Sequence, residues 1–389
     1  MGILDRVLGR EEQRAVGGNW FALGLDSNKS AAGVHIDQET ALSISALYAS
    51  VRLYADTVAS LSWQASIRDN GTRRPVTRPR WMDRPIPGNP NFTGFDLKHR
   101  LVSSLLLDGN CFALVLRSGV EVVEVRPLDP RKVEIIRDER GNPLYKVNSS
   151  EGSVVVGPED MIHIPLFAYG ENDRGLSPVE HHRVTLALSS ATQLFSAKFY
   201  EQGAQPSAVI RVPSDLNAEQ ASQLRESFGR RHEGIEKMHK VAVLTGGADY
   251  QPISAKIADL QLVETMHYGV EQIARIYAVP LHLLQYPGGN SSYNSQEMAM
   301  LAWLQTGLAP ILKRLEDGLS RIIPGNTTFV SFNTGSLLKA TTKESYEALV
   351  LALNNGLLSL DEARAIIDRG PVAGGDQHWK PLNIGTVEP

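Results

Sequence analysis

The chain has 389 residues, of which 42% are hydrophobic and 21% charged, and these proportions predict a folded protein of roughly two or three domains. Its formal net charge of −4 excludes a protein that holds nucleic acid through bulk positive charge. A single cysteine, Cys111, excludes an intrachain disulfide and favours a reducing compartment; we expect it to be a small core residue.

The N-terminal part of the chain is predicted to be an arm followed by a helix. Residues 1–37 are rich in glycine and lack a hydrophobic period, so we expect a flexible or docked arm without the apolar segment of a secretory signal. From about Gln38 to Ser60, apolar residues recur with the period of a helix. Residues 61–85 then predict a short strand and a basic, proline-rich loop. A solvated loop is favoured over a contact with DNA or an acidic partner, because Trp81 is the only aromatic residue among these charges.

A second helical pattern and a set of short strands come next. Apolar residues recur with helical period from Thr93 to Leu107, and Asp108-Gly109 forms a turn. Four strands separated by close turns are predicted after it: Phe112–Arg117, Val120–Arg126, Val133–Arg137 and Leu144–Val147. An antiparallel meander packed on the two helices predicts an α+β domain over residues 38–177.

A long helix and a small insert follow this domain. Ser177-Pro-Val-Glu180 has the pattern of a helix start, and the helix should run to about Gln202. Its small and polar interior residues fit close packing beside another helix, such as one from a neighbouring subunit. The insert, residues 204–257, predicts a strand (Ala208–Val212), a helix (about Ala218 to Arg231) and a second strand (Val241–Leu244). It carries five basic residues: Arg225, Arg230, Arg231, Lys237 and Lys240.

The remainder of the chain is organised around two helices joined by a polar hinge. The first helix is predicted from Asp259 to Val279, with Pro280 as its stop. The hinge, Gln285–Tyr293, has no apolar period. A second helix should begin near Asn294 and continue to Ile323, with a kink or break at Pro310.

The last residues predict a small helical end domain. Two helices are expected there, Thr342–Asn355 and Leu360–Asp368, followed by a glycine-rich loop.

The sequence contains no recognisable catalytic or metal-binding motif. Phosphate-binding glycine loops, nucleophile elbows and paired zinc ligands are absent. His181 and His182 are adjacent, so on a helix they face different directions and are expected to be surface or packing residues. The sequence therefore predicts no enzymatic activity, no catalytic residue, no metal and no cofactor.

Several stretches along the chain resemble the portal (head-to-tail connector) proteins of long-tailed double-stranded DNA bacteriophages. The resemblance covers about residues 38–385, and the order of the stretches carries it rather than any one of them. They are Leu105–Ala113, Val125–Val133, Gly175–Glu180, Phe199–Pro206, Ile273–Leu284 and Gly370–Asp376. The hinge departs from the family by being unusually polar over Pro287–Tyr293, which leaves the contacts of this loop open.

The resemblance implies a portal fold, assembled as a ring of usually twelve subunits around a DNA channel at one capsid vertex. A separate terminase motor would pump double-stranded DNA through it, and the DNA would leave the same way. The implied parts are an arm (1–37), a wing (38–177), stem helices (178–203 and 258–280), a clip (204–257), a tunnel loop (281–294), a long helix and strand completing the wing (295–338), and a crown (339–389).

The resemblance also implies which residues meet DNA and partner proteins. The tunnel loop would line the channel's constriction through Gln285, Tyr286, Gly288, Gly289, Asn290, Ser291, Ser292, Tyr293 and Asn294. The clip, with its five basic residues, would dock the large terminase and later the head–tail adaptor. Major capsid and scaffolding proteins are further implied partners, and a membrane is not. The expected location is the virion, after assembly in the bacterial cytoplasm.

Two other classes of protein stay open from the residues alone. A DNA-processing enzyme would need a metal or nucleophile site, and a capsid shell or scaffold protein would form shells or rods instead of one ring. In the ring that the resemblance implies, a lining rich in lysine and arginine would bind DNA tightly, whereas a neutral or acidic one lets the duplex slide. The alternative for residues 285–294 is a surface turn between two helices, and the channel is favoured over it only because of the family resemblance.

Overall fold

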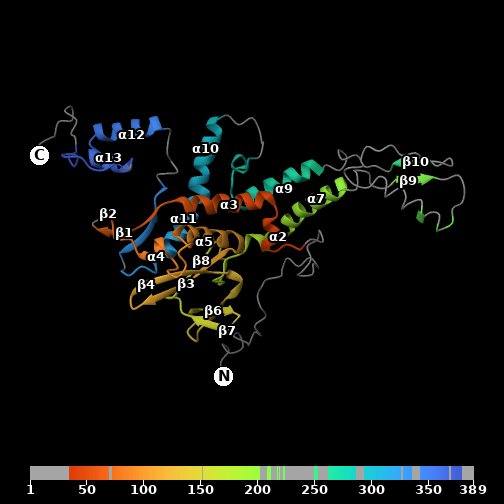
Figure 1. Cartoon of the computed structure of the whole chain (residues 1–389), viewed down its shortest axis with the longest axis horizontal. Coiled ribbons are helices and arrows are strands. Elements are labelled where there is room, and N and C mark those ends of the chain that lie inside the picture. Colours follow the sequence, from red (N-terminus) through yellow and green to blue (C-terminus); the bar gives the residue numbers. More distant parts are fainter. Residues whose placement is uncertain are drawn as a thin grey trace, which may run out of the picture. The chain divides into compact units, whose positions relative to one another are not determined.

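The computed structural model (Figure 1) describes residues 35–69, 72–150, 152–201, 208–211, 217, 219, 222–223, 249–252, 262–285, 293–325, 327–334, 342–367 and 369–378. The chain is divided into two compact units. The first comprises the residues up to Ser60 and Ala65–Val330, and the second comprises Leu61–Gln64 and the residues from Ser331 onward.

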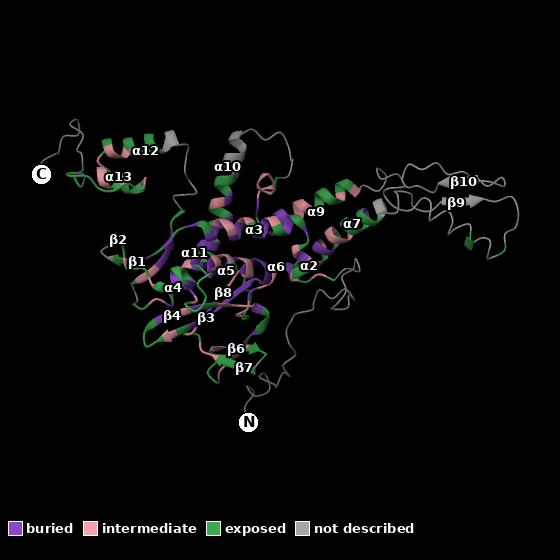
Figure 2. Cartoon of the chain, in the orientation of Figure 1, coloured by how far each residue is buried: buried purple, intermediate pink, exposed green. Residues whose placement is uncertain are grey.

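The helical core of the first unit is formed by α3 (Ser45–Ser60) and α5 (Gly94–Asp108), which pack against each other. Buried residues gather on both helices (Figure 2). Leu47 on α3 and Leu101 on α5 are almost fully buried, and burying such a side chain stabilises the fold by roughly 1.5–3 kcal/mol. The 3.6-residue period of apolar residues in the sequence thus arises because each helix buries one face against the other.

Two short helices flank this core. The single helix predicted from Gln38 to Ser60 is wrong in one respect, because a turn at Ser43 separates α2 (Gln38–Leu42) from α3. Asp37 caps α2 by accepting a hydrogen bond from the Thr40 N–H. The helix α4 (Arg80–Asp83) buries Trp81. The prediction of a loop is therefore wrong for part of this region, which contains α4 and the strand β2 (Thr72–Pro75), and its one aromatic residue belongs to the core.

Two antiparallel three-stranded sheets follow α5. The first has the order β4-β3-β8, from β3 (Asn110–Ser118), β4 (Glu121–Leu128) and β8 (Met161–Pro165). A 3-10 turn, η1 (Pro130–Lys132), leads to the second sheet. It has the order β5-β6-β7, from β5 (Val133–Arg137), β6 (Pro143–Ser149) and β7 (Gly152–Val156).

The predicted four-strand meander is therefore wrong at one step. Its β3–β4 and β5–β6 pairs form, but β4 does not pair with β5. The first sheet is completed by β8 beside β3 and the second by β7 beside β6, and neither β7 nor β8 was predicted. Phe112 of β3, Tyr145 of β6 and Met161 of β8 belong to one buried cluster. Because this cluster joins the two sheets through side chains, neighbouring strands in sequence need not share a sheet.

The next helices belong to the predicted stem. The helix expected from Ser177 to Gln202 is broken at His182, giving α6 (Pro178–His181) and α7 (Arg183–Glu201). α9 (Leu262–Ile276) lies alongside α7 (Figure 1). Between them in sequence, β9 (Ala208–Arg211) pairs antiparallel with β10 (Asp249–Pro252), a strand that was not predicted.

Other predicted elements between these helices lie largely outside the described residues. The described positions 219, 222 and 223 are helical. The predicted strand at residues 241–244 and the cap at Asp259 lie outside the described part of the chain.

α9 ends before Pro280. Ala278 adopts the left-handed conformation with φ 50°, and the Val279 N–H donates to the Ala274 carbonyl, which is a Schellman arrangement. A 3-10 turn, η4 (Leu281–Leu284), follows.

The second helix of the central segment is interrupted near Pro310, where a kink or break was predicted. α10 (Tyr293–Trp303) passes into a π-helical turn, η5 (Leu304–Leu308), and then into α11 (Ala309–Ser320). Proline cannot donate a backbone hydrogen bond, so the ladder changes its register one turn earlier. A third sheet has the order β11-β1-β2, from β11 (Thr328–Phe332), β1 (Trp63–Asp69) and β2 (Thr72–Pro75).

The second unit contains α12 (Thr342–Asn354) and α13 (Leu360–Ile366), close to the predicted helices. Ser359 and Glu362 form a capping box at the start of α13. Asp361 accepts a hydrogen bond from the Val372 N–H, so the glycine-rich loop folds back onto this helix.

Candidate functional site

A buried polar network lies where α5, β3, β8 and the segment before α6 meet. Asn110, at the start of β3, is fully buried. Its Oδ1 accepts hydrogen bonds from the Gly175 N–H at 2.7 Å and from His163 Nε2 at 3.2 Å, and its Nδ2 donates to the Gly175 carbonyl at 2.8 Å. One side chain thus fixes the backbone 65 residues further along the chain.

His163 of β8 is held in this network in its neutral form. Its ring stacks on Phe112 with centroids 4.4 Å apart, and Nδ1 lies 3.4 Å from the Tyr145 hydroxyl. Because Nε2 donates to Asn110, Nδ1 carries the lone pair that accepts from Tyr145. Burial lowers the pKa of His163 to about 4, and the positive charges of Arg174 and Arg321 act in the same direction.

Arg174 ties both sheets to the C-terminal end of α5. Its Nη2 donates to Asp108 Oδ1 at 2.9 Å, and its Nη1 donates to the Val133 carbonyl at 2.9 Å. Burial raises the pKa of Asp108, and Arg174 opposes this effect. The guanidinium lies 5.7 Å from the centre of the Phe112 ring. The half-buried Arg174 thus links the end of α5 to β5 of one sheet and lies against Phe112 of the other.

The backbone at this point is packed too closely for side chains. Gly109 has φ 78°, and a Cβ there would lie 2.0 Å from the Leu176 carbonyl oxygen. A Cβ on Gly175 would lie 2.3 Å from the Gly109 oxygen. Two of the stretches that carried the resemblance, Leu105–Ala113 and Gly175–Glu180, therefore meet in one place.

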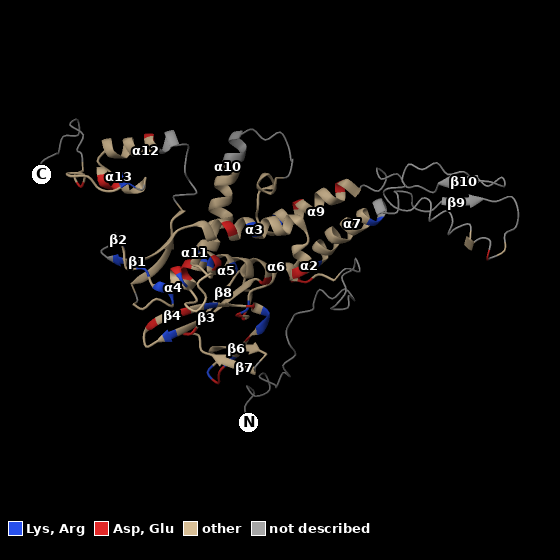
Figure 3. Cartoon of the chain, in the orientation of Figure 1, with Lys and Arg blue, Asp and Glu red and all other residues tan. Residues whose placement is uncertain are grey.

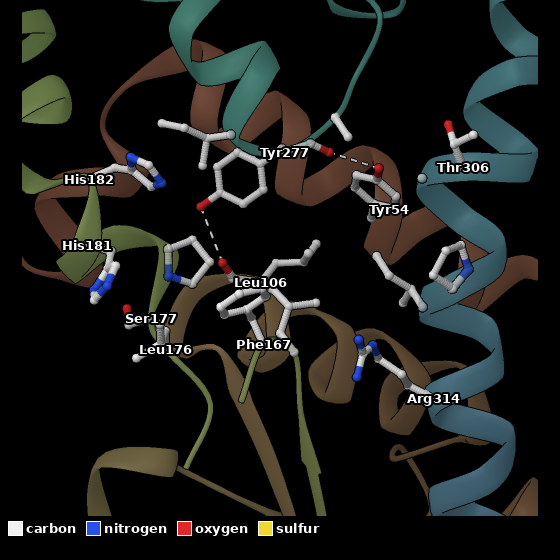
Figure 4. Close-up of a pocket in the computed structure, with 17 residues that line it drawn as sticks. Tyr54, Leu106, Phe167, Leu176, Ser177, His181, His182, Tyr277, Thr306 and Arg314 are labelled. Carbon is white, nitrogen blue, oxygen red and sulfur yellow. Dashed lines mark hydrogen bonds between the residues drawn. The ribbon is translucent and has the colours of Figure 1, made fainter. Parts of the chain in front are cut away.

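Next to this network is a cavity of about 470 Å³, lined by α3, α5, α6, the end of α9 and the region around Pro310 (Figure 4). Two of its lining residues are tyrosines that form hydrogen bonds to backbone carbonyls of other elements. The Tyr54 hydroxyl donates to the Tyr277 carbonyl at 2.9 Å, and the Tyr277 hydroxyl donates to the Leu106 carbonyl at 3.3 Å. Burial raises the pKa of Tyr54 to about 12. Both hydroxyls are structural donors at neutral pH.

The helices α7 and α9, which were predicted to form a stem, pack through small side chains and together carry no net charge. A Cβ on Gly269 of α9 would lie 2.5 Å from Ser189 Oγ of α7, so the helices approach closely. By sequence, α7 contains Arg183, Lys198 and Glu201, and α9 contains Glu264, Glu271 and Arg275, which gives no net charge. Figure 3 colours the charged residues of the described part of both helices. The close packing expected for α7 is confirmed, and its described partner is α9 of the same chain.

Comparison with known proteins identifies the family. The family described as phage portal protein matches residues 45–368. This chain belongs to the phage portal protein family.

Individual portal proteins and the neck of a phage-like particle are similar to this chain. The probable portal protein of Streptomyces phage phiC31 is 32% identical over 375 residues, which cover 92% of this chain and 82% of the relative. The neck of a native gene transfer agent (GTA) particle, computed with C12 symmetry, matches with a TM-score of 0.60 and 22% identity over 86% of this chain and 92% of the other. An HK97-family phage portal protein from Corynebacterium diphtheriae matches with a TM-score of 0.59 and 16% identity over 79% and 99%.

These findings confirm the resemblance, the mixed helix-and-sheet portal fold, and the function of a phage capsid portal protein. The portal family is structural rather than enzymatic. Within the described residues, no group of three His, Cys, Asp or Glu side chains is placed to hold a metal ion. No described helix combines the length and hydropathy needed to cross a membrane. The division into wing, stem, clip, tunnel loop and crown stays a prediction.

The predicted channel and docking residues are only partly described. Gln285 is exposed and ends η4 in the left-handed conformation with φ 55°. Tyr293 and Asn294 begin α10, one residue earlier than the predicted start. The other predicted channel residues lie outside the described part of the chain: Tyr286, Gly288, Gly289, Asn290, Ser291 and Ser292. So do all the predicted docking residues, namely Arg225, Arg230, Arg231, Lys237 and Lys240.

Sequence reasoning missed the polar network. Asp108, Asn110 and Gly175 lie within stretches that carried the resemblance, so a signal was present for them. His163 lies in a strand that was not predicted, and Arg174 precedes a motif without being part of one. His181 and His182 are exposed and line the cavity, in agreement with a surface or packing position.

Proposed function

We propose that this protein assembles as a closed ring of about twelve copies at one vertex of a phage capsid, and that double-stranded DNA enters and leaves through its channel. The C12 symmetry of the similar GTA neck supports this subunit number. The proposed location is the virion, after assembly in the host cytoplasm.

The observation that supports the proposal of a ring is the apolar outer surface of the proposed stem helices, α7 and α9. On α7, Leu188 and Leu194 are 45% and 50% exposed, and on α9, Val263 is 58% exposed. These side chains lie on helices whose other faces already pack against each other. Exposed apolar groups on adjacent helices are typical of an interface, and a head-to-tail contact that closes buries them on every subunit.

The ring predicts a particle of defined mass. Twelve chains of 42.6 kDa give about 511 kDa, measurable by mass photometry. The double variant Leu188→Glu/Val263→Glu should yield subunits or small oligomers, because it places carboxylates in the proposed interface. Val120→Glu is the matched control, since Val120 is 73% exposed in the turn between β3 and β4. Rings formed equally well by the stem variant would show that these faces do not join subunits.

The channel proposal rests on the charge balance of the stem and on the polar hinge. α7 and α9 together carry no net charge, so a channel lined by them would not hold DNA through released counterions. We place Gln285–Asn294 at the constriction, where Asn290 and Ser291 would contact phosphates briefly. The variant Asn290→Lys/Ser291→Lys should slow packaging, most strongly at low salt. Asn290→Gln/Ser291→Thr is the uncharged control.

Packaged DNA length in proheads built with each ring is the measurement. Normal packaging by the lysine variant at every salt concentration, with intact rings, would show that the loop does not meet DNA.

The clip is proposed as the docking head for terminase and then for the head–tail adaptor. Its position between two stem helices and its basic residues support this role. Arg230→Glu/Arg231→Glu should weaken terminase binding and leave ring formation intact. Arg140→Glu, in the exposed turn between β5 and β6, is the control. Loss of soluble rings in the clip variant would mean that these arginines join subunits instead.

The remaining partners are proposed on the family assignment. Major capsid and scaffolding proteins would surround the ring during assembly. No enzymatic activity is proposed for the chain itself, and purified rings should show no nuclease or ATPase activity above that of a mock preparation.

A further inference from the structure

The cavity beside the polar network has walls suited to an apolar occupant. Its volume of about 470 Å³ lies within the range of pockets that bury a drug-sized group. Leu106, Leu176 and Ile276 contribute aliphatic surface, and Phe167 lines it while 60% exposed. A large exposed aromatic side chain at the edge of such a hollow is typical of a surface that receives another apolar group.

The charges around the cavity have one sign. None of the described residues that line it is acidic, whereas His181, His182 and Arg314 are basic (Figure 4). Burial lowers the pKa of His182, and His181 acts in the same direction, so Arg314 supplies the fixed positive charge. Arg314 donates one hydrogen bond, to the Pro165 carbonyl at 3.2 Å, and a guanidinium has further donors. The cavity therefore favours an apolar group followed by a carboxylate.

One segment of this chain outside the described residues has this composition. Trp20-Phe-Ala-Leu-Gly-Leu-Asp26 combines four large apolar side chains with one carboxylate and contains no basic residue. The other apolar stretch of the arm, Ile3–Leu8, pairs Asp5 with Arg6, so it brings no net negative charge to the positive rim and has no aromatic side chain for the apolar walls. Composition thus selects Trp20–Asp26 within residues 1–34.

The segment is also tethered close to the cavity. The described chain begins at His35, just before α2, and Gln38 of α2 lies 3.4 Å from the Asp108 carboxylate at the end of α5. Leu106, two residues earlier, lines the cavity. The linker Ser27–Val34 has eight residues and can span up to about 26–29 Å when extended.

We propose that Trp20–Asp26 docks into this cavity of its own chain, with Trp20 and Phe21 against the apolar walls and Asp26 at Arg314. The arm would thereby bind across the junction of α5, α6, α9 and α11. The occupant is the chain's own N-terminal segment rather than a separate protein.

Peptide binding to the full-length protein tests the occupant. A fluorescent peptide of residues Asn19–Asp26 should bind the full-length variant Trp20→Ala/Phe21→Ala. It should bind the unsubstituted chain about tenfold or more weakly, because a tethered segment competes at millimolar effective concentration. The matched peptide control carries the same two alanines. A charge swap tests the polar contact. The peptide with Asp26→Lys should bind the Trp20→Ala/Phe21→Ala protein more tightly when that protein also carries Arg314→Glu than when it keeps Arg314.

Crosslinking tests the position without depending on peptide affinity. In a Cys111→Ala background, the F21C/T306C pair should react with a short bismaleimide within one chain, and at least several-fold faster than the control pair F21C/V120C. Thr306 lines the cavity and is exposed, whereas Val120 does not line it. Equal rates for the two pairs, or crosslinks only between chains, would overturn the proposal. Equal binding of the peptide to both proteins would overturn it as well.

Discussion

His163 makes the junction between the two sheets sensitive to pH. The perturbation is a change from pH 7 to pH 5, with His163→Gln as a reference that cannot titrate in this range. Burial lowers the pKa of His163 from 6.5 to about 4. The unfolded chain therefore binds the proton more readily than the folded one. The stabilisation is fully present above about pH 6.5 and is lost as the pH falls towards 4.

The size of the effect follows from the two pKa values. A difference between 6.5 and about 4 corresponds to roughly 3 kcal/mol once both states have titrated. Between pH 7 and pH 5 the loss is about 2 kcal/mol, because the folded histidine is still mostly neutral at pH 5. A second cause acts locally, since protonation removes the Nδ1 lone pair that accepts from Tyr145.

Hydrogen exchange of the β3 and β8 amides measures this loss of stability at the strands that surround His163. The free energy of opening in the unsubstituted protein should fall by about 2 kcal/mol more than in His163→Gln between pH 7 and pH 5, a ratio of roughly thirty-fold in opening equilibrium. Comparing the two proteins at each pH cancels the intrinsic exchange rates and the titration of other groups. The same pH dependence in both proteins would refute the assignment of this titration to His163.

Three further changes test the packing described above. Gly109→Ala should lower the free energy of unfolding by several kcal/mol in urea denaturation, because its Cβ would meet the Leu176 carbonyl at 2.0 Å. The control is Gly119→Ala, with φ 64° and open space around it, which should lower the free energy of unfolding by only about 1–2 kcal/mol. Gly269→Leu should separate α7 from α9 and reduce ring yield by mass photometry, and Gly88→Leu, where a Cβ meets nothing within 4 Å, should not. Asn110→Ala should lower the free energy of unfolding by about 2–4 kcal/mol, since it leaves the Gly175 N–H and His163 without the partner that Asn110 provides. Unchanged protection of the Gly175 amide in hydrogen exchange would contradict this role.

The elements that could be predicted from sequence are those whose pattern is local. α3 and α5 each bury one stripe, and α9 buries its stripe in the second half, at Gly269, Ile273 and Ala274, so the spacing of their apolar residues was sufficient. The breaks at Ser43 and His182 were missed because neither residue is a glycine or proline. β8 was missed because its burial comes from pairing with β3, nearly fifty residues earlier in the chain, and a short apolar run such as Met161–Pro165 has no periodicity of its own.

The polar network could not be derived in the same way. A buried asparagine or histidine has no pattern of its own, because its partners are set by the tertiary structure. Asn110 and His163 lie 53 residues apart, and only the pairing of β3 with β8 brings them together. Family resemblance marked the neighbourhood of Asn110 without giving its role.

The C-terminal end of α5 explains why so many elements meet there. A helix leaves its last four carbonyls without intrahelical partners, and each of these four is used by a different group. Leu105 accepts from the Gly109 N–H, Leu106 from the Tyr277 hydroxyl, Leu107 from the Ser177 hydroxyl, and Asp108 from the Asn110 amide. The ends of α9, α6 and β3 are therefore bound to one helix terminus. A displacement of α5 by even an ångström or so relative to α9 and the start of α6 would disturb the hydrogen bonds to the Tyr277 and Ser177 hydroxyls, so these two segments are expected to move together with α5.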